Sequence, residues 1–210
     1  MDPPDGAERR PGFPALGMKR SKARLTKTVG LSGPRVSAIR IALPVAAAGL
    51  LGKSRLDWQV SLSGTLHLWI REPGEALTSA ELILAWANLG SLIEGSIKLL
   101  LSVYYETFKA DIDNLKKVNA YNKKKQEPLS PAGLTLEPLR QYCALREILD
   151  NCELALVQLV QQHRNAIHAF KDRSIGDEAE FEQALQDYLQ MLRNIIARLL
   201  YPDDQYVPSE

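Results

Sequence analysis

Residues 78–97 read TSAELILAWANLGSLIEGSI, and this stretch determines the fold class that we predict. Thr78 and Glu81 have the spacing of a capping box, in which a hydroxyl and a carboxylate satisfy free amides at the start of a helix. Apolar residues then recur every three or four positions, which is the period of an α-helix. The stripe consists of Leu82, Trp86, Leu89, Ile93, Ile97, Leu100, Tyr104, Phe108, Ile112 and Leu115. It predicts one helix of about 38 residues, or about 57 Å.

A second apolar stripe runs along the same expected helix, through Ala85, Leu92, Leu99 and Val103. A helix that is apolar on two sides packs from two sides, either within a bundle or across a dimer interface. Gly90 or Gly95 is expected to mark a bend or a close contact with another helix.

Two more helices are expected towards the C-terminus. Thr135–Pro138 can start the first of them, with a proline in its first turn, and helical spacing of apolar residues continues to Phe170. Asp177–Glu180 resembles a capping box for the last helix, which ends before Pro202. We therefore predict an all-α fold, an antiparallel helical bundle over residues 77–202.

The N-terminal part has a different composition. Prolines and glycines among basic residues predict a disordered basic tail over residues 1–35. No acidic residue occurs between Met18 and Leu56, so a targeting segment is the alternative. Residues 36–76 form an extension of uncertain structure. Within it, Trp58–Trp69 alternates apolar and polar residues as a strand does, but we predict a helix because the chain that follows is helical.

Bulk composition narrows the functional classes. The 210-residue chain is 45% hydrophobic and 24% charged, with a net charge of +1, which is ordinary for a globular protein. Residues 1–40 hold nine of the 26 Lys and Arg residues and three of the 25 Asp and Glu residues, so residues 41–210 carry a net charge of −5. Its two cysteines and three histidines make no zinc-ligand pattern, and we expect no metal and no cofactor. No apolar run approaches the roughly 20 residues that span a bilayer, so we expect a cytoplasmic protein without a membrane partner.

Residues 116–134 are rich in lysine, proline and glycine and predict an exposed basic linker. Lys123, Lys124 and Lys125 are candidate RNA contacts within it. The competing interpretation is an ordinary solvated loop.

The strongest candidate for chemistry is the sequence RNAIH at residues 164–168. Arg164 and His168 are expected to share one helix face, about one turn apart. A guanidinium and an imidazole so placed can hold a phosphate and move a proton. The competing interpretation is a polar helix edge, with Arg164 paired to a neighbouring acid. His163 lies on the apolar stripe and is expected to be a core histidine with satisfied hydrogen bonds.

Two segments together resemble the HEPN superfamily of small helical domains. One is Trp86–Gly95 on the long helix, and the other is Arg164–His168 near the end of the following helix. The resemblance covers roughly residues 78–200. It implies antiparallel helices that dimerise, and it implies metal-independent endoribonuclease activity of the kind found in toxin–antitoxin, phage-defence and RNA-processing systems.

The resemblance also implies roles for four residues. His168 would exchange a proton with the ribose 2′-hydroxyl or the leaving oxygen, and Arg164 would bind the scissile phosphate. Asn165 would orient His168 or contact phosphate, and Glu94 would orient Arg164 or His168. In a homodimer, two Arg–His pairs would line one cleft, and an antitoxin would be a further partner.

Two other functions stay open at this point. Since the Arg–His spacing is shorter than is usual in the family, the chain can equally be a non-catalytic HEPN-like module that binds RNA, nucleotide or protein. The third hypothesis is a structural dimerisation bundle.

Overall fold

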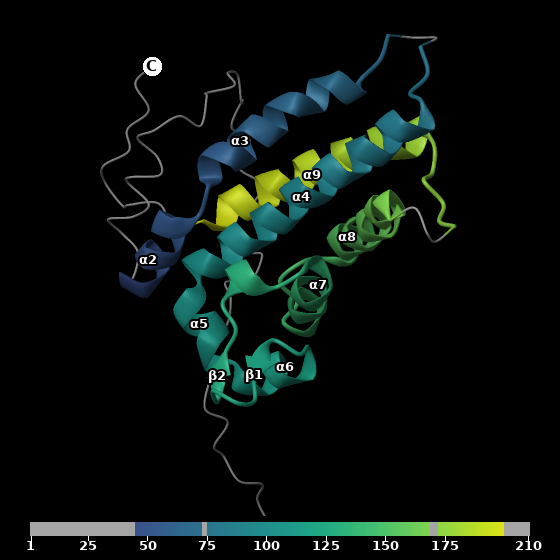
Figure 1. The fold of residues 1–210 in the computed structure, drawn as a ribbon. Coiled ribbons are helices and arrows are strands. Elements are labelled where there is room, and N and C mark those ends of the chain that lie inside the picture. Colours follow the sequence, from purple (N-terminus) through teal and green to yellow (C-terminus); the bar gives the residue numbers. More distant parts are fainter. Residues whose placement is uncertain (1–44, 73–74, 169–171, 200–210) are drawn as a thin grey trace, which may run out of the picture.

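The computed structural model describes residues 45–72, 75–168 and 172–199 (Figure 1). The expected disordered tail over 1–35 lies outside the described residues, as does the start of the extension over 36–76. The described chain is mainly helical, which confirms the all-α prediction. In order, its elements are α2 (Val45–Lys53), α3 (Leu56–Gly64), the 3₁₀ helix η1 (Thr65–Trp69), α4 (Ser79–Val103), α5 (Tyr105–Ala110), α6 (Ile112–Lys117), strands β1 (Tyr121–Asn122) and β2 (Glu127–Pro128), η2 (Pro131–Gly133), α7 (Leu136–Leu145), α8 (Asn151–Arg164), η3 (Asn165–Ile167) and α9 (Glu178–Arg198).

Helix α4 lies at the centre, in contact with α2, α3, α8 and α9 (Figure 1). The predicted capping box is confirmed at its start. The Thr78 hydroxyl accepts a hydrogen bond from the Glu81 amide, and the Glu81 carboxylate accepts one from the Thr78 amide at 2.8 Å. Both apolar stripes of α4 face other helices, so residues on several sides of it are buried. The two-sided packing that the sequence predicts therefore holds for this helix.

The long first helix is shorter than predicted. It ends at Val103, and the backbone leaves the helical conformation at Tyr104 and again at Asp111. Asp111 accepts hydrogen bonds from the Asn114 amide and the Tyr142 hydroxyl and forms an ion pair with Arg146 at 3.1 Å. These side-chain partners stabilise the bend between α5 and α6. The apolar period survives the bends because the short helices still bury Phe108 and Leu115 against the rest of the core.

The predicted basic linker over 116–134 is more ordered than expected. It contains a two-stranded antiparallel hairpin, in which Tyr121 pairs with Pro128 and Asn122 with Glu127. Val118, Ala120, Pro131 and Leu134 are buried beside it. The segment is therefore part of the packed fold, although Lys116, Lys117 and the lysines of its turn are exposed.

The second predicted helix is also interrupted. It splits into α7 and α8, with Glu147 at a φ of 51° in the connection. Asp150 and Glu153 form a complete capping box that starts α8, with hydrogen bonds of 2.8 and 2.9 Å. As a result, Ile148 and Leu149 are buried while Leu145 is exposed. The sequence does not reveal this break, because apolar residues keep helical spacing across it.

Contacts between side chains fix the helix directions. Helices α8 and α9 run antiparallel, because Glu153 contacts Asn194 near one end and His163 contacts Glu180 near the other. Helices α4 and α9 run parallel, as the pairs Trp86–Phe181, Ser96–Tyr188 and Tyr104–Arg198 show. In an antiparallel bundle the first and third helices run parallel to each other, so these directions do not conflict with the predicted order.

Part of the uncertain extension packs on α4. The Gln59 side chain donates to the Leu92 carbonyl at 2.7 Å, and Asn88 donates to the Thr65 hydroxyl at 2.7 Å. Gly95 provides the close approach that the sequence predicts, because a Cβ there would overlap the Gln59 amide. The helical interpretation of Trp58–Trp69 is confirmed as α3 followed by η1.

Within the described residues, α4 is long and apolar enough to span a membrane by length and composition alone. This differs from the sequence analysis, which found no such run. Half of the apolar window is buried by the neighbouring helices, and the core helix of a globular domain has the same length and composition.

Candidate functional site

Arg164 is the last residue of α8 and reaches across to α4. Its Nη1 lies 2.9 Å from Glu94 Oε2 and 3.4 Å from the Gly90 carbonyl oxygen. Gly90 makes this approach possible, because a Cβ at that position would lie 2.5 Å from Arg164 Cδ. Both charged side chains are about four-fifths buried, with 23% and 21% of their surfaces exposed. Gly90 is thus the close helix contact predicted from the sequence.

Glu94 joins two cations. Its second carboxylate oxygen lies 2.7 Å from the Lys98 ammonium, one turn further along α4. Arg164, Glu94 and Lys98 therefore form a charged group with a net charge of +1 at the crossing of α4 and α8. A guanidinium has five N–H donors. Both hydrogen bonds described for Arg164 use Nη1.

His168 does not share a helix face with Arg164, which corrects the sequence prediction. Helix α8 ends at Arg164, and Asn165–Ile167 form a 3₁₀ turn. His168 follows with φ −87° and ψ 86°, outside both helical conformations, and its side chain is exposed. Its backbone amide donates to the Asn165 carbonyl at 3.2 Å. The predicted one-turn alignment fails because the α-helix ends at Arg164, four residues before His168.

The predicted site residues therefore divide into two sets. Glu94 and Arg164 are joined directly, as expected for a residue that orients Arg164. Asn165 is partly buried and meets His168 through its backbone. The pairing of Arg164 with an acid also matches the competing interpretation, in which this is a polar helix edge. The structure brings Glu94 and Arg164 together. It leaves His168, four residues after Arg164, exposed at the surface.

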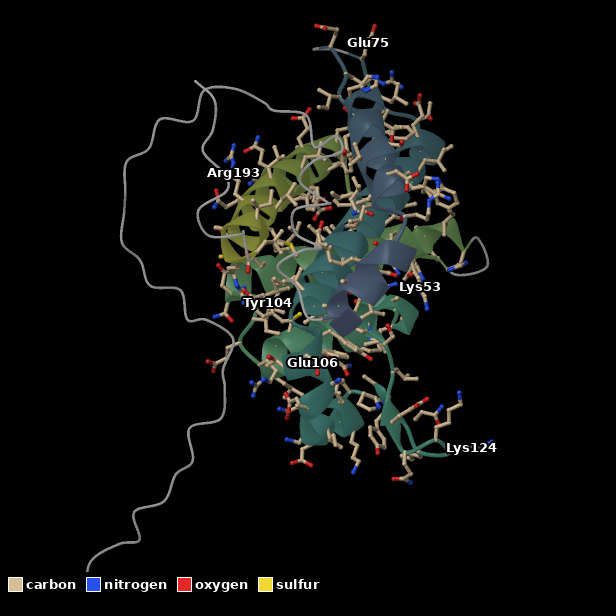
Figure 2. The ribbon with its side chains drawn as sticks, turned by 90° about the vertical axis from the view of Figure 1, so that its left-hand side faces the viewer. Lys53, Glu75, Tyr104, Glu106, Lys124 and Arg193 are labelled. Carbon is tan, nitrogen blue, oxygen red and sulfur yellow. The ribbon has the colours of Figure 1, made fainter. Side chains whose placement is uncertain are left out.

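The predicted RNA-contacting lysines lie elsewhere. Lys123, Lys124 and Lys125 occupy the turn of the β1–β2 hairpin, where the Asn122 side chain accepts from the amides of the last two. All three are exposed. The hairpin lies at the lower end of the molecule in Figure 1, while the end of α8 lies at the upper right, and Figure 2 shows Lys124 projecting from that lower end. The lysines and the Arg164 group are not brought together in one chain.

His163 has contacts that sequence reasoning did not anticipate. Its ring is buried, as predicted, and packs on Trp86 with ring centroids 4.6 Å apart. Its Nδ1 lies 2.9 Å from the Ser174 carbonyl oxygen and its Nε2 lies 3.0 Å from Glu180 Oε2. The nearest signal in the sequence is Gly176, which adopts a φ of 65° beside these groups. That glycine indicated a turn, but the partners of the turn cannot be read from spacing.

Among the described residues, no group of three or more His, Cys, Asp or Glu side chains could hold a metal ion. The chemistry available near the end of α8 is therefore that of a partly neutralised guanidinium and an exposed imidazole.

No family model matches this chain, and neither a curated protein nor a solved structure is significantly similar to it. The HEPN resemblance accordingly rests on residues 86–95 and 164–168 alone.

Proposed function

We propose that this protein is a HEPN-like RNA-acting protein, a metal-independent endoribonuclease that uses Arg164 and His168. One observation carries the proposal. The two segments on which the resemblance rests are 70 residues apart in the sequence, and the Arg164–Glu94 ion pair joins them at 2.9 Å. This contact supports the proposal because it joins the two segments that carry the resemblance.

Each residue has a defined role in the proposed reaction. His168 accepts the proton of a ribose 2′-hydroxyl, and the 2′-oxygen then attacks the adjacent phosphorus. The bond from phosphorus to the 5′-oxygen breaks, that oxygen takes up a proton from water, and a 2′,3′-cyclic phosphate end remains. Arg164 stabilises the negative charge that develops on the phosphate oxygens, while Glu94 fixes the guanidinium. No cofactor takes part.

The proposal includes the assembly and setting that the resemblance implies. Two copies form a homodimer with both Arg–His pairs at one cleft, in the cytoplasm. An antitoxin would then block RNA access to that cleft. Asn165 contacts the phosphate or holds His168 in place.

A second function has its own supporting observation. Glu94 already neutralises much of the Arg164 charge, and the end of α8 separates Arg164 from His168. This arrangement favours a non-catalytic module that binds RNA, nucleotide or a partner protein.

RNA cleavage in the presence of EDTA separates the two functions. Wild type is expected to produce 2′,3′-cyclic phosphate ends, and His168→Ala is expected to lose at least about a hundredfold in rate, the usual contribution of a general acid or base. His67→Ala is the matched control, because His67 is also exposed but lies on η1. Equal cleavage by wild type and His168→Ala, or none by either, would contradict the endoribonuclease. RNA binding without cleavage would support the second function.

Assembly and toxicity are tested separately. Light scattering at micromolar concentration should give twice the mass of one chain, and a monomer would exclude the shared cleft. Expression in a bacterial host should slow growth if the protein is a toxin, and Arg164→Ala should relieve that effect.

A further inference from the structure

The outer side of the first described helices is rich in exposed apolar side chains. Helix α3 and η1 contain no buried residue. Of the ten large apolar side chains that are exposed in the described residues, five lie between positions 58 and 70, among them Trp58 at 59% and Ile70 at 58%. Single exposed apolar residues are normal on a globular protein, whereas a concentration of them marks an interaction site.

Contacts with α4 show which side of this segment faces outward. The Gln59 side chain donates to the Leu92 carbonyl on α4, so this side of α3 faces inward. Trp58 and Leu62 lie one turn apart on a neighbouring face of α3, and both are exposed. Figure 1 shows α3 on the side of α4 that is turned away from α7 and α8, so this face belongs to the outside of the bundle.

The apolar surface continues onto α4. Thr65 accepts a hydrogen bond from Asn88, and Arg71 forms an ion pair with Glu81. Residues 65–71 therefore run alongside α4 in the opposite direction. Since Leu84 falls between Glu81 and Asn88 on the same side of α4, it lies next to this stretch, and it is exposed. What we call the outer apolar surface consists of Trp58, Leu62, Leu68, Ile70 and Leu84.

Positive charge adjoins one end of the outer apolar surface. Residues 19–55 contain nine Lys and Arg residues and no Asp or Glu. In the described part of this stretch, Lys53 and Arg55 are exposed, and the Arg55 guanidinium lies 3.9 Å from the centre of the Trp58 ring. Asp57, the acid in α3, is paired with Arg55 at 2.6 Å and so adds no free negative charge. The stretch that leads into the apolar surface is therefore strongly basic.

Three kinds of partner can be compared for such a surface. Helices α3 and η1 have nine and five residues, so together they are about 24 Å long. At a helix width of about 10 Å they cover about 240 Å², well below the roughly 800 Å² that each partner buries in a stable dimer. RNA is bound by cations and aromatic rings, whereas all members of the surface except Trp58 are aliphatic. A lipid surface suits both properties, because a small apolar area and a basic segment add together in membrane binding.

We propose that the outer apolar surface docks the protein onto an anionic phospholipid membrane. Its side chains enter the boundary between headgroups and acyl chains, where tryptophan is favoured, and the cations of residues 19–55 attract the anionic headgroups. Figure 2 shows Glu75 at the end of the segment opposite Lys53, so the Lys53 end lies nearer the lipid. The protein lies on the membrane without crossing it, whereas the expectation of no membrane partner considered only spanning segments. Docking does not depend on RNA cleavage.

Co-flotation of the full chain with lipid vesicles tests the electrostatic part. Each Lys or Arg near an anionic surface adds about a fivefold factor, so vesicles of phosphatidylcholine with about 30% phosphatidylglycerol should bind at least about a hundredfold more tightly than pure phosphatidylcholine. Raising the salt from about 0.1 M to 1 M should weaken binding at least about tenfold, because the Debye length falls from about 10 Å to 3 Å. Equal binding to both kinds of vesicle, or none to either, would overturn the proposal.

Paired substitutions test the apolar part. One variant combines Trp58→Gln with Leu62→Gln, and the other combines Leu68→Gln with Ile70→Gln. Each should weaken binding to the anionic vesicles by at least about tenfold, because two apolar side chains no longer enter the lipid. Wild-type affinity in both variants would show that this surface does not face the membrane.

The matched control combines Leu145→Gln with Leu189→Gln. These leucines are similarly exposed, at 48% and 50%, but lie on α7 and α9. The control should bind as wild type does, and a loss as large as in the surface variants would refute a specific docking face. Tryptophan emission gives a second measurement, because Trp86 is fully buried while Trp58 is exposed. Anionic vesicles should shift the emission to shorter wavelength, and Trp58→Gln should abolish most of that shift.

Two results would assign the outer apolar surface to another occupant and reject membrane docking. The first is a wild-type dimer that becomes monomeric in the surface variants, with no binding to vesicles, which would identify a second copy of the chain. The second is RNA binding that the surface variants lose, again without binding to vesicles. Light scattering and a filter-binding assay with single-stranded RNA measure these outcomes.

Discussion

His163 and His168 lie five residues apart, yet one is inside the layer between α4, α8 and α9 and the other is at the surface. His163 touches Trp86, Ser174 and Glu180, whereas His168 lies beyond the end of α8 and is exposed. Two other pairs of like residues are divided in the same way. Trp86 and Cys143 are buried in the core, whereas Trp58 and Cys152 are exposed. Residue type therefore suggests which reaction a histidine can serve. Where the helix ends determines whether its side chain is buried or exposed.

The cysteine pair should show the largest difference. Burial raises the pKa of the Cys143 thiol to about 12, and Cys152 is exposed at the start of α8. Only the thiolate reacts with a disulfide reagent. Compared with an ordinary thiol, a pKa near 12 lowers the thiolate fraction at pH 8 by about a thousandfold. We expect one fast thiol per native chain, two after denaturation and none in native Cys152→Ser. Two equally fast native thiols would remove the contrast.

The tryptophan pair should differ in stability. Trp86 is fully buried and packs edge-on against Phe181 with ring centroids 5.1 Å apart. Trp86→Ala should lower the free energy of unfolding by about 3–5 kcal/mol, measured by urea denaturation. Trp58 is 59% exposed, so Trp58→Ala should cost less than about 1 kcal/mol. Similar losses for both would show that the outer surface of α3 is covered in solution.

The sequence predicts the inner layer better than the connections. Periodicity identified α4 and α9, and the capping box at Thr78 was read correctly because both of its partners are local. The same signal is present at Asp150–Glu153, but the apolar stripe runs on across it and hides the break. The bend at Asp111 depends on Arg146, 35 residues further along the chain, which no period reveals.

In the candidate site, too, features that depend on distant parts of the chain could not be predicted from the sequence. Through the resemblance, Glu94 was expected to orient Arg164 or His168; the structure places it 2.9 Å from Arg164, and its role in a site stays a prediction. The alignment of Arg164 with His168 depended on a helix continuing, and the helix end at Arg164 is a feature of the whole fold. The contacts of His163 with Ser174 and Glu180 likewise depend on how the chain returns from α8 to α9.

The histidine pair should show a smaller effect than the tryptophans. His163→Ala removes a buried ring and leaves the Ser174 carbonyl without its donor, so it should lower the free energy of unfolding by about 2 kcal/mol. His168→Ala should change it by less than about 0.5 kcal/mol, because that side chain is exposed. Thermal denaturation of both variants at pH 6 compares them. A large loss in His168→Ala would mean that His168 has structural contacts and is unsuitable as a test of catalysis.

The Arg164–Glu94 pair is intermediate in burial between the core and the surface, since about a fifth of each side chain is exposed. A double-mutant cycle with Glu94→Gln and Arg164→Met should give a coupling energy of about 1 kcal/mol after allowing for solvent screening. The cycle with Lys98→Met is the comparison, and its coupling should be about 0.3–0.5 kcal/mol, as for other pairs one turn apart on a helix. Equal coupling energies in both cycles would show that the Arg164–Glu94 pair joins α4 and α8 no more strongly than an ordinary surface ion pair within one helix.

The hairpin lysines should affect stability least. Lys123, Lys124 and Lys125 are exposed, so replacing all three with alanine should change the free energy of unfolding by less than about 0.5 kcal/mol. RNA binding can still respond, because each phosphate contact that is lost reduces the salt dependence of the binding constant. For three contacts to single-stranded RNA, the slope of log K against log salt should fall by about 2. Since the hairpin and the end of α8 lie apart in one chain, an RNA long enough to reach both should show the change, while a short RNA bound at Arg164 should not. An unchanged slope with the long RNA would restrict RNA contacts to the end of α8.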